Sequence, residues 1–250
     1  MTRFTTGLPW LDEAFPEGLD VPSSTVITGP GGAGKPIIAL GYVSAWLQQG
    51  GSVISAPLQF PDPDFISGNL VELYGVDPAE YAQDFLHVEF DPDIEGIQEV
   101  SHDHLKANVV TPDTWALILD EADSRFEDDE LGTLFFATAL NLPLFSRTYR
   151  AELLETFEDL FDAGDVTTLF CLSTSMIEDV ARSVASLSDN LLFADPLDDH
   201  ETLHFRVDRA TDVPFSSEDL EAPFTYEQLT AVKDRSDDYR VTPMDKIRAV

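Results

Sequence analysis

Residues 25–40 read TVITGPGGAGKPIIAL, and most of what can be said about the fold starts from them. A β-branched run over residues 25–28 predicts a strand, a glycine-rich loop follows it, and an apolar helix is expected to begin near Lys35. The spacing Gly29-x-x-x-x-Gly34-Lys35 is that of the P-loop, whose backbone N–H groups and lysine surround phosphate oxygens. The positive end of a helix dipole favours an anion at the same place. The alternative, a glycine-rich turn with no ligand, explains neither the four glycines nor the position of the lysine.

The residues expected to bind a nucleotide form one continuous run: Gly29, Pro30, Gly31, Gly32, Ala33, Gly34, Lys35 and Pro36. Pro36 departs from the P-loop pattern, which has a Ser or Thr here whose hydroxyl ligates Mg²⁺. Proline is tolerated in the first turn of a helix because its missing N–H has no partner there. The sequence therefore predicts bound ATP and an intact helix, and it leaves the binding of Mg²⁺ open.

The composition is that of a folded chain with a very acidic surface. Across 250 residues, 14 basic and 47 acidic side chains give a formal net charge of −33, while 43% of the residues are hydrophobic and supply a core. The length suits one large α/β domain. Acid-rich and lysine-poor composition resembles that of proteins from extreme halophiles. We therefore expect a salt-rich cytoplasm, where screening reduces the repulsion among carboxylates.

Other sequence features narrow the location of the protein. Cys171 is the single cysteine and lies in an apolar run, so we expect a buried thiol and no disulfide within the chain. No basic segment followed by an apolar one opens the sequence, and no apolar run approaches 18 residues. These observations predict a cytoplasmic protein that does not span a membrane.

The N-terminal segment carries a second pattern. Residues 6–12, TGLPWLD, and residues 17–19, EGL, resemble the TGxxxLD…GGL lead-in of the KaiC and RecA/RadA-like ATPases, which precedes the P-loop at this distance. The resemblance covers about residues 4–210. It implies a RecA-like P-loop NTPase fold, ATP as the ligand, and a homo-oligomer or a protein partner.

Two positions that carry chemistry in that family are changed. In KaiC-like proteins two adjacent glutamates follow the strand after the P-loop helix, and one of them activates the attacking water. The matching positions here are Pro57 and Leu58, followed by Gln59. A glutamine can orient water without accepting its proton, so Gln59 is a candidate substitute; the alternative is an ordinary loop residue.

A second apolar run, residues 115–119, ends in Asp120 and Glu121 and is expected to be a strand. In P-loop proteins an aspartate at this place holds Mg²⁺ and a following glutamate can act as a general base. Asp120 is therefore the predicted metal ligand, and Glu121 joins Lys35 among the catalytic candidates. Chance is the alternative, since carboxylates are abundant throughout this chain.

Later segments add weaker signals. Ser173, Thr174 and Ser175 follow a predicted strand over residues 166–172, where RecA-like proteins place a polar group that senses the γ-phosphate. A helix N-cap is the other interpretation of Ser175. The resemblance also implies that Arg209 reaches the ATP of a neighbouring subunit, although Val207 stands where the accompanying lysine would be.

The alternation of strand and helix patterns predicts an α/β fold with a doubly wound, mostly parallel sheet and helices on both faces. We expect helices over residues 97–107 and 128–142, and a single domain over residues 1–235 followed by a loose tail over residues 236–250. The favoured function is a nucleotide-dependent regulator with weak or no ATP hydrolysis. The alternatives are an active ATPase with Glu121 as its base and, less favoured because no basic stripe is present, a recombinase-like DNA-binding ATPase.

Overall fold

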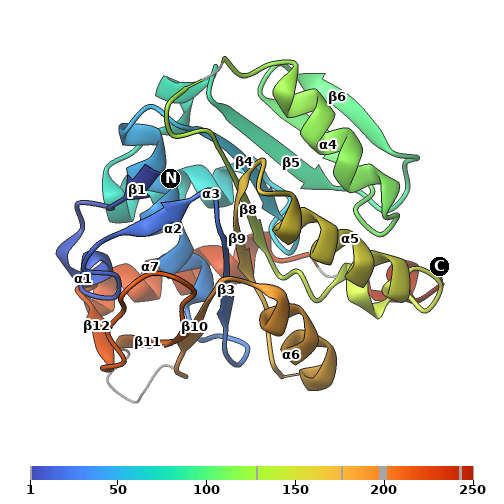
Figure 1. Ribbon diagram of the computed structural model, residues 1–250. Coiled ribbons are helices and arrows are strands. Elements are labelled where there is room, and N and C mark those ends of the chain that lie inside the picture. Colours follow the sequence, from blue (N-terminus) through green and yellow to red (C-terminus); the bar gives the residue numbers. More distant parts are fainter. Residues whose placement is uncertain (1, 128, 176, 197–201, 242–243, 250) are drawn as a thin grey trace.

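A ten-stranded mixed sheet forms the centre of the computed structural model, which describes residues 2–127, 129–175, 177–196, 202–241 and 244–249 (Figure 1). The strand order is β12-β11-β10-β3-β9-β8-β4-β5-β7-β6. The strands from β10 to β7 run parallel, and β6, β11 and β12 are antiparallel to their neighbours. Their bounds are β3 Ser24–Thr28, β4 Ser52–Pro57, β5 Phe85–Phe90, β6 Ile97–Ser101, β7 His104–Ala107, β8 Thr133–Thr138, β9 Thr167–Cys171, β10 Asn190–Ala194, β11 Leu203–Arg209 and β12 Leu220–Ala222.

Helices cover both faces of this sheet. Side chains of α1, α2, α3 and α7 pack in one hydrophobic cluster, and those of α4, α5, α6 and α8 pack in the other. The helix bounds are α1 Pro9–Asp12, α2 Lys35–Gln48, α3 Pro63–Tyr74, α4 Asp113–Asp123, α5 Arg150–Ala163, α6 Glu178–Leu187, α7 Tyr226–Tyr239 and α8 Met244–Ala249, with 3₁₀ turns η1 Pro78–Tyr81 and η2 Pro143–Phe145 and a separate pair of strands, β1 Thr2–Phe4 and β2 Leu19–Val21. The predicted doubly wound α/β fold is confirmed.

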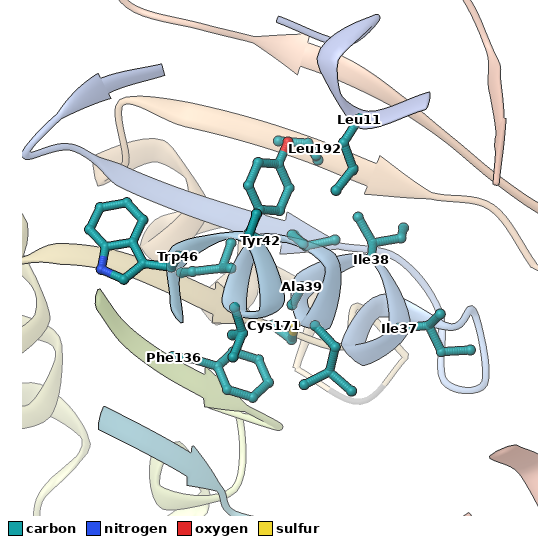
Figure 2. Packing of buried hydrophobic residues seen from close by; sticks show 14 of the residues in the cluster. Leu11, Ile37, Ile38, Ala39, Tyr42, Trp46, Phe136, Cys171 and Leu192 are labelled. Atoms are coloured by element: carbon teal, nitrogen blue, oxygen red, sulfur yellow. The ribbon is translucent and has the colours of Figure 1, made fainter. Parts of the chain in front are cut away.

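The central strands are apolar on both sides because both sides are covered. In β8, Leu134 and Phe136 belong to the cluster around α2, whereas Phe135 and Ala137 belong to the cluster around α4 and α5. Figure 2 shows Phe136 and Cys171 close to α2, whose Tyr42 side chain points the other way, toward Leu192. Strand β3, which precedes the glycine-rich loop, is buried throughout.

Three expected elements are wrong. Residues 97–107 form the antiparallel pair β6–β7 instead of a helix. Residues 115–121 belong to α4 and not to a strand, and β8 lies within residues 128–142, where a helix is expected. The error at residues 115–119 comes from a short apolar run, which cannot be assigned to strand or helix by periodicity alone.

Part of the C-terminal segment, for which a loose tail is expected over residues 236–250, lies in helices. Helix α7 continues to Tyr239, and in α8 Ile247 is fully buried in the cluster around α4 and α5. The backbone N–H of Val241 donates to the carbonyl of Gln59, 2.8 Å away. Val241 therefore contacts the loop at the carboxyl end of β4.

Candidate functional site

The glycine-rich loop connects the carboxyl end of β3 to the first residue of α2, as its sequence predicts. Gly29, Gly32 and Gly34 have φ angles of 140°, 80° and 69°, a region that side chains other than glycine rarely adopt. At Gly29 a Cβ atom would also lie 2.2 Å from the carbonyl oxygen of Ala194. The tight turn therefore depends on glycine, and it brings the loop over the carboxyl ends of the parallel strands, where ligands of such sheets bind.

The loop presents backbone donors in the way a phosphate site requires. Helix α2 begins without a side-chain cap at Gly34. Within the part of the chain that the structure describes, the N–H groups of Gly32, Gly34 and Lys35 make no hydrogen bond. Gly31 and Gly32 are exposed to solvent. These N–H groups, together with the helix dipole, form the cradle expected for an anion.

Lys35 lies inside the loop. Its Nζ donates to the carbonyl oxygens of Gly29 and Pro30, at 3.0 and 2.5 Å, and its exposed fraction is 7%. Burial lowers the pKa of the Lys35 ammonium to about 8, against a smaller opposing effect of the nearby Cys171 thiol. A phosphate beside this ammonium would replace the water that burial has removed and would favour its charged form.

The loop that follows β9 packs against the glycine-rich loop. Ser175 Oγ accepts a hydrogen bond from the N–H of Gly31 at 2.9 Å, and the N–H of Thr174 donates to the carbonyl of Gly29 at 3.0 Å. The first of these contacts uses a donor that a phosphate oxygen would otherwise take. Ser175 is therefore in direct contact with the cradle, and its hydroxyl competes with a phosphate for one N–H group.

The positions that would hold Mg²⁺ do not fit that ion. Pro36 has no hydroxyl, and Thr138 is the last residue of β8, the strand that lies beyond β9 from β3. Continuing the pairing of Ala137 with Phe170 places Thr138 beside Cys171. In P-loop proteins an aspartate held by such a strand supports the metal. The residues that close the four central strands on this edge, Thr28, Pro57, Thr138 and Cys171, include no carboxylate, and Mg²⁺ prefers carboxylate oxygens.

Asp120 and Glu121 lie far from the loop. Both are in the last turn of α4, where Asp120 is exposed and Glu121 Oε1 accepts from Arg125 Nη2 at 2.6 Å. Arg125 also donates to the carbonyl of His102, in the turn that precedes β7. Because β7 runs parallel to β3, this turn is at the amino end of the strands, opposite the loop. The prediction of a strand ending in these carboxylates is wrong, and the structure does not bring them to the glycine-rich loop.

Gln59 is close to its expected place. It is half-buried and follows β4, three strands from β3, a separation of about 14 Å at ordinary strand spacing. Leu58, at the position of a catalytic glutamate, is 1% exposed and belongs to the hydrophobic core. Neither Leu58 nor Gln59 therefore offers a group that could accept a proton from water.

The Arg209 side chain makes its hydrogen bonds within its own chain. Its Nη2 donates to the carbonyl oxygens of Ala185 and Ser188 at 2.7 and 2.5 Å. Arg209 closes β11, whereas Leu203 at the other end of that strand lies against Gly34. Six residue steps of a strand span about 20 Å, so Arg209 does not approach the cradle of its own subunit.

A separate hollow does not suit a phosphate. It has a volume of about 350 Å³ and is lined by Pro61, Asp62, Pro63, Glu89, Asp238, Tyr239 and Val241. Three of these side chains are carboxylates and none is cationic, so the hollow repels anions. The glycine-rich loop remains the better candidate.

Comparison with solved structures gives the fold a reference. A KaiC-like protein from the hyperthermophilic archaeon Pyrococcus horikoshii superposes with a TM-score of 0.65 over 88% of this chain and 94% of its own, at 13% identity. This chain has a KaiC-like RecA fold. No protein-family model matches the sequence, and no curated protein matches it. At this identity the likeness concerns the fold alone. Among the described residues, no helix is long and apolar enough to cross a membrane.

Proposed function

We propose that this protein binds ATP through residues 29–36 and acts as a nucleotide-dependent regulator that hydrolyses ATP slowly or not at all. The observation that supports binding is the set of loop N–H groups, unpaired within the described residues, beside the buried ammonium of Lys35. Each of these groups attracts a phosphate oxygen, and all of them belong to one short loop at a helix N-terminus.

The residues at the carboxyl ends of the central strands explain why ATP hydrolysis should be slow. ATP hydrolysis in P-loop proteins uses a held metal and an oriented or activated water. Pro36 and Thr138 replace the metal-supporting positions, and Leu58 replaces the glutamate. Loss of a general base alone lowers a rate by about 10²–10⁴-fold. Neither alternative function gains support, because Glu121 is at the opposite end of the sheet and the net charge of −33 opposes nucleic acid.

A regulator must pass on its bound state to something else, and we propose a protein partner or a second copy of this chain in that role. Ser175 contacts the cradle and precedes α6 in the chain, so a bound phosphate that displaces its hydroxyl moves Ser175. Light scattering with and without ATP measures the molecular mass and so tests whether a second copy of the chain is the partner. A monomer in both states would leave Arg209 with no neighbouring site to serve.

The experiment for the function combines binding and turnover in one buffer of about 1 M KCl, where the screening length is about 3 Å. Calorimetric titration with ATP should show saturable binding in the wild type and none in Lys35→Ala. Phosphate release should stay far below about 1 s⁻¹, a common enzyme rate. Saturable binding that is unchanged in Lys35→Ala would contradict the assignment of the site, and rapid Lys35-dependent phosphate release would contradict the regulator role.

A further inference from the structure

Thr138 places a buried hydroxyl at the carboxyl end of β8. The residue is 1% exposed, and within the described residues its Oγ1 makes no hydrogen bond. Buried hydroxyl groups in folded proteins are almost always paired, because an unpaired one has lost its water without compensation. Several other buried hydroxyls in the described residues are also unpaired, among them that of Thr168, and Thr138 differs from Thr168 in closing a strand beside the predicted ligand site.

The direction of the Thr138 side chain follows from the alternation along β8. Leu134 and Phe136 face the cluster around α2, so Thr138, two residues further, faces the same side. Helix α2 begins on that side with Lys35. Thr138 also neighbours Cys171, whose thiol interacts electrostatically with the Lys35 ammonium. The hydroxyl thus lies under the first turn of α2, on the floor of the cradle.

The chemistry of this floor differs from that of a metal-supporting site. A Thr hydroxyl can donate a hydrogen bond to an anionic oxygen, whereas the carboxylate usual at this position can only accept one or ligate a cation. Pro36 removes the other metal-supporting oxygen. Both replacements change the site in the same direction, from oxygen ligands for a cation toward direct contact with the phosphate.

We propose that the cradle takes a nucleotide phosphate without a divalent cation, and that the Thr138 hydroxyl donates a hydrogen bond to the phosphate or to an ordered water bound to it. This inference rests on the proposed nucleotide site. It assigns Thr138 as a residue that determines which form of the nucleotide, metal-free or metal-bound, is accepted.

The test is calorimetric titration of the full chain with ATP in about 1 M KCl, once with excess EDTA and once with excess MgCl₂. The inference predicts dissociation constants that agree within about threefold, less than 1 kcal/mol apart. Affinity at least tenfold weaker in EDTA would overturn the inference and leave the nucleotide site standing. Absence of binding in both buffers would instead overturn the proposed function.

A matched pair of variants tests the part assigned to Thr138. Thr138→Val and Thr168→Val each replace a threonine that is 1% exposed and whose hydroxyl is unpaired within the described residues, and Thr168 lies at the amino end of β9, away from the loop. Thr138→Val should weaken ATP binding in EDTA by about tenfold, as loss of a hydrogen bond to a charged group does, while Thr168→Val should not. Equal affinities of the two variants, each with wild-type circular dichroism, would overturn this role. If Thr138→Val does not fold, Thr138→Ser should keep wild-type affinity, and a tenfold loss there would overturn it as well.

Discussion

Replacement of Lys35 by Met should stabilise the protein without ligand while abolishing nucleotide binding. Burial lowers the pKa of Lys35 from its ordinary 10.5 to about 8. Each pKa unit corresponds to about 1.4 kcal/mol, so the charged form costs about 3.4 kcal/mol at neutral pH. The substitution also removes two hydrogen bonds to carbonyl groups, worth about 1 kcal/mol each. The free energy of unfolding should therefore rise by about 1–2 kcal/mol.

The increase in the free energy of unfolding should depend on pH, which distinguishes it from other stabilising effects. Between about pH 8 and pH 10.5 the unfolded chain holds the Lys35 proton and the folded chain does not, so the stability of the wild type rises with pH relative to the variant. Below pH 8 the full cost is present, and above pH 10.5 it is absent. Urea unfolding of both proteins in about 1 M KCl from pH 7 to 11 measures the difference. Lys233→Met is the control, because Lys233 is exposed on α7. A Lys35→Met variant less stable than the wild type at pH 7, or a difference independent of pH, would refute the argument.

Three further predictions concern the loop and the charge of the chain. Ser175→Ala removes the hydroxyl that competes for the Gly31 N–H and should tighten ATP binding by about threefold in calorimetry. Ser183→Ala, on the exposed face of α6, is the control and should leave the affinity unchanged. Weaker ATP binding in Ser175→Ala would contradict this prediction. Gly29→Ala should lower the free energy of unfolding by about 2–4 kcal/mol, because the residue has a positive φ and the added Cβ would clash with Ala194. Gly32→Ala, whose added Cβ meets nothing within 4 Å, should lower it by about 1 kcal/mol. Equal losses in the two variants would contradict this prediction. Dialysis to about 0.1 M salt, where the screening length is about 10 Å, should abolish the near-ultraviolet circular dichroism of a chain with net charge −33, and an unchanged spectrum and melting point would contradict the expected salt requirement.

The sequence predicts the strand, loop and helix around Lys35 because each has its own signal. The β-branched run over residues 25–28, the glycines with fixed spacing and the apolar helix after them agree with one another, and the structure has all three. Local features that support one another in this way are the most reliable basis for a prediction. The doubly wound architecture follows from the same alternation further along the chain.

The place of β8 next to β9 could not be predicted in the same way. Residues 115–121 offer an apolar run with terminal carboxylates, but Trp115, Ile118 and Ala122 are buried at helical spacing while Leu117 is 42% exposed. The strand that takes the central place, β8, ends in Thr138 and carries no acidic marker. Without a carboxylate at the end of β8, the sequence holds no local pattern that marks this strand, and its position is known only from the strand pairing.

Amide-resolved NMR during titration with ATP tests the phosphate cradle most directly. Uniformly ¹⁵N-labelled protein in about 1 M KCl, the salt that screens its charge, should show its largest chemical-shift changes at the N–H groups of Gly31, Gly34 and Lys35. These changes should saturate with ATP and be absent in Lys35→Met. Changes confined to the hollow around Glu89 and Asp238, or no changes at any ATP concentration, would contradict the assignment of residues 29–36 as a nucleotide site.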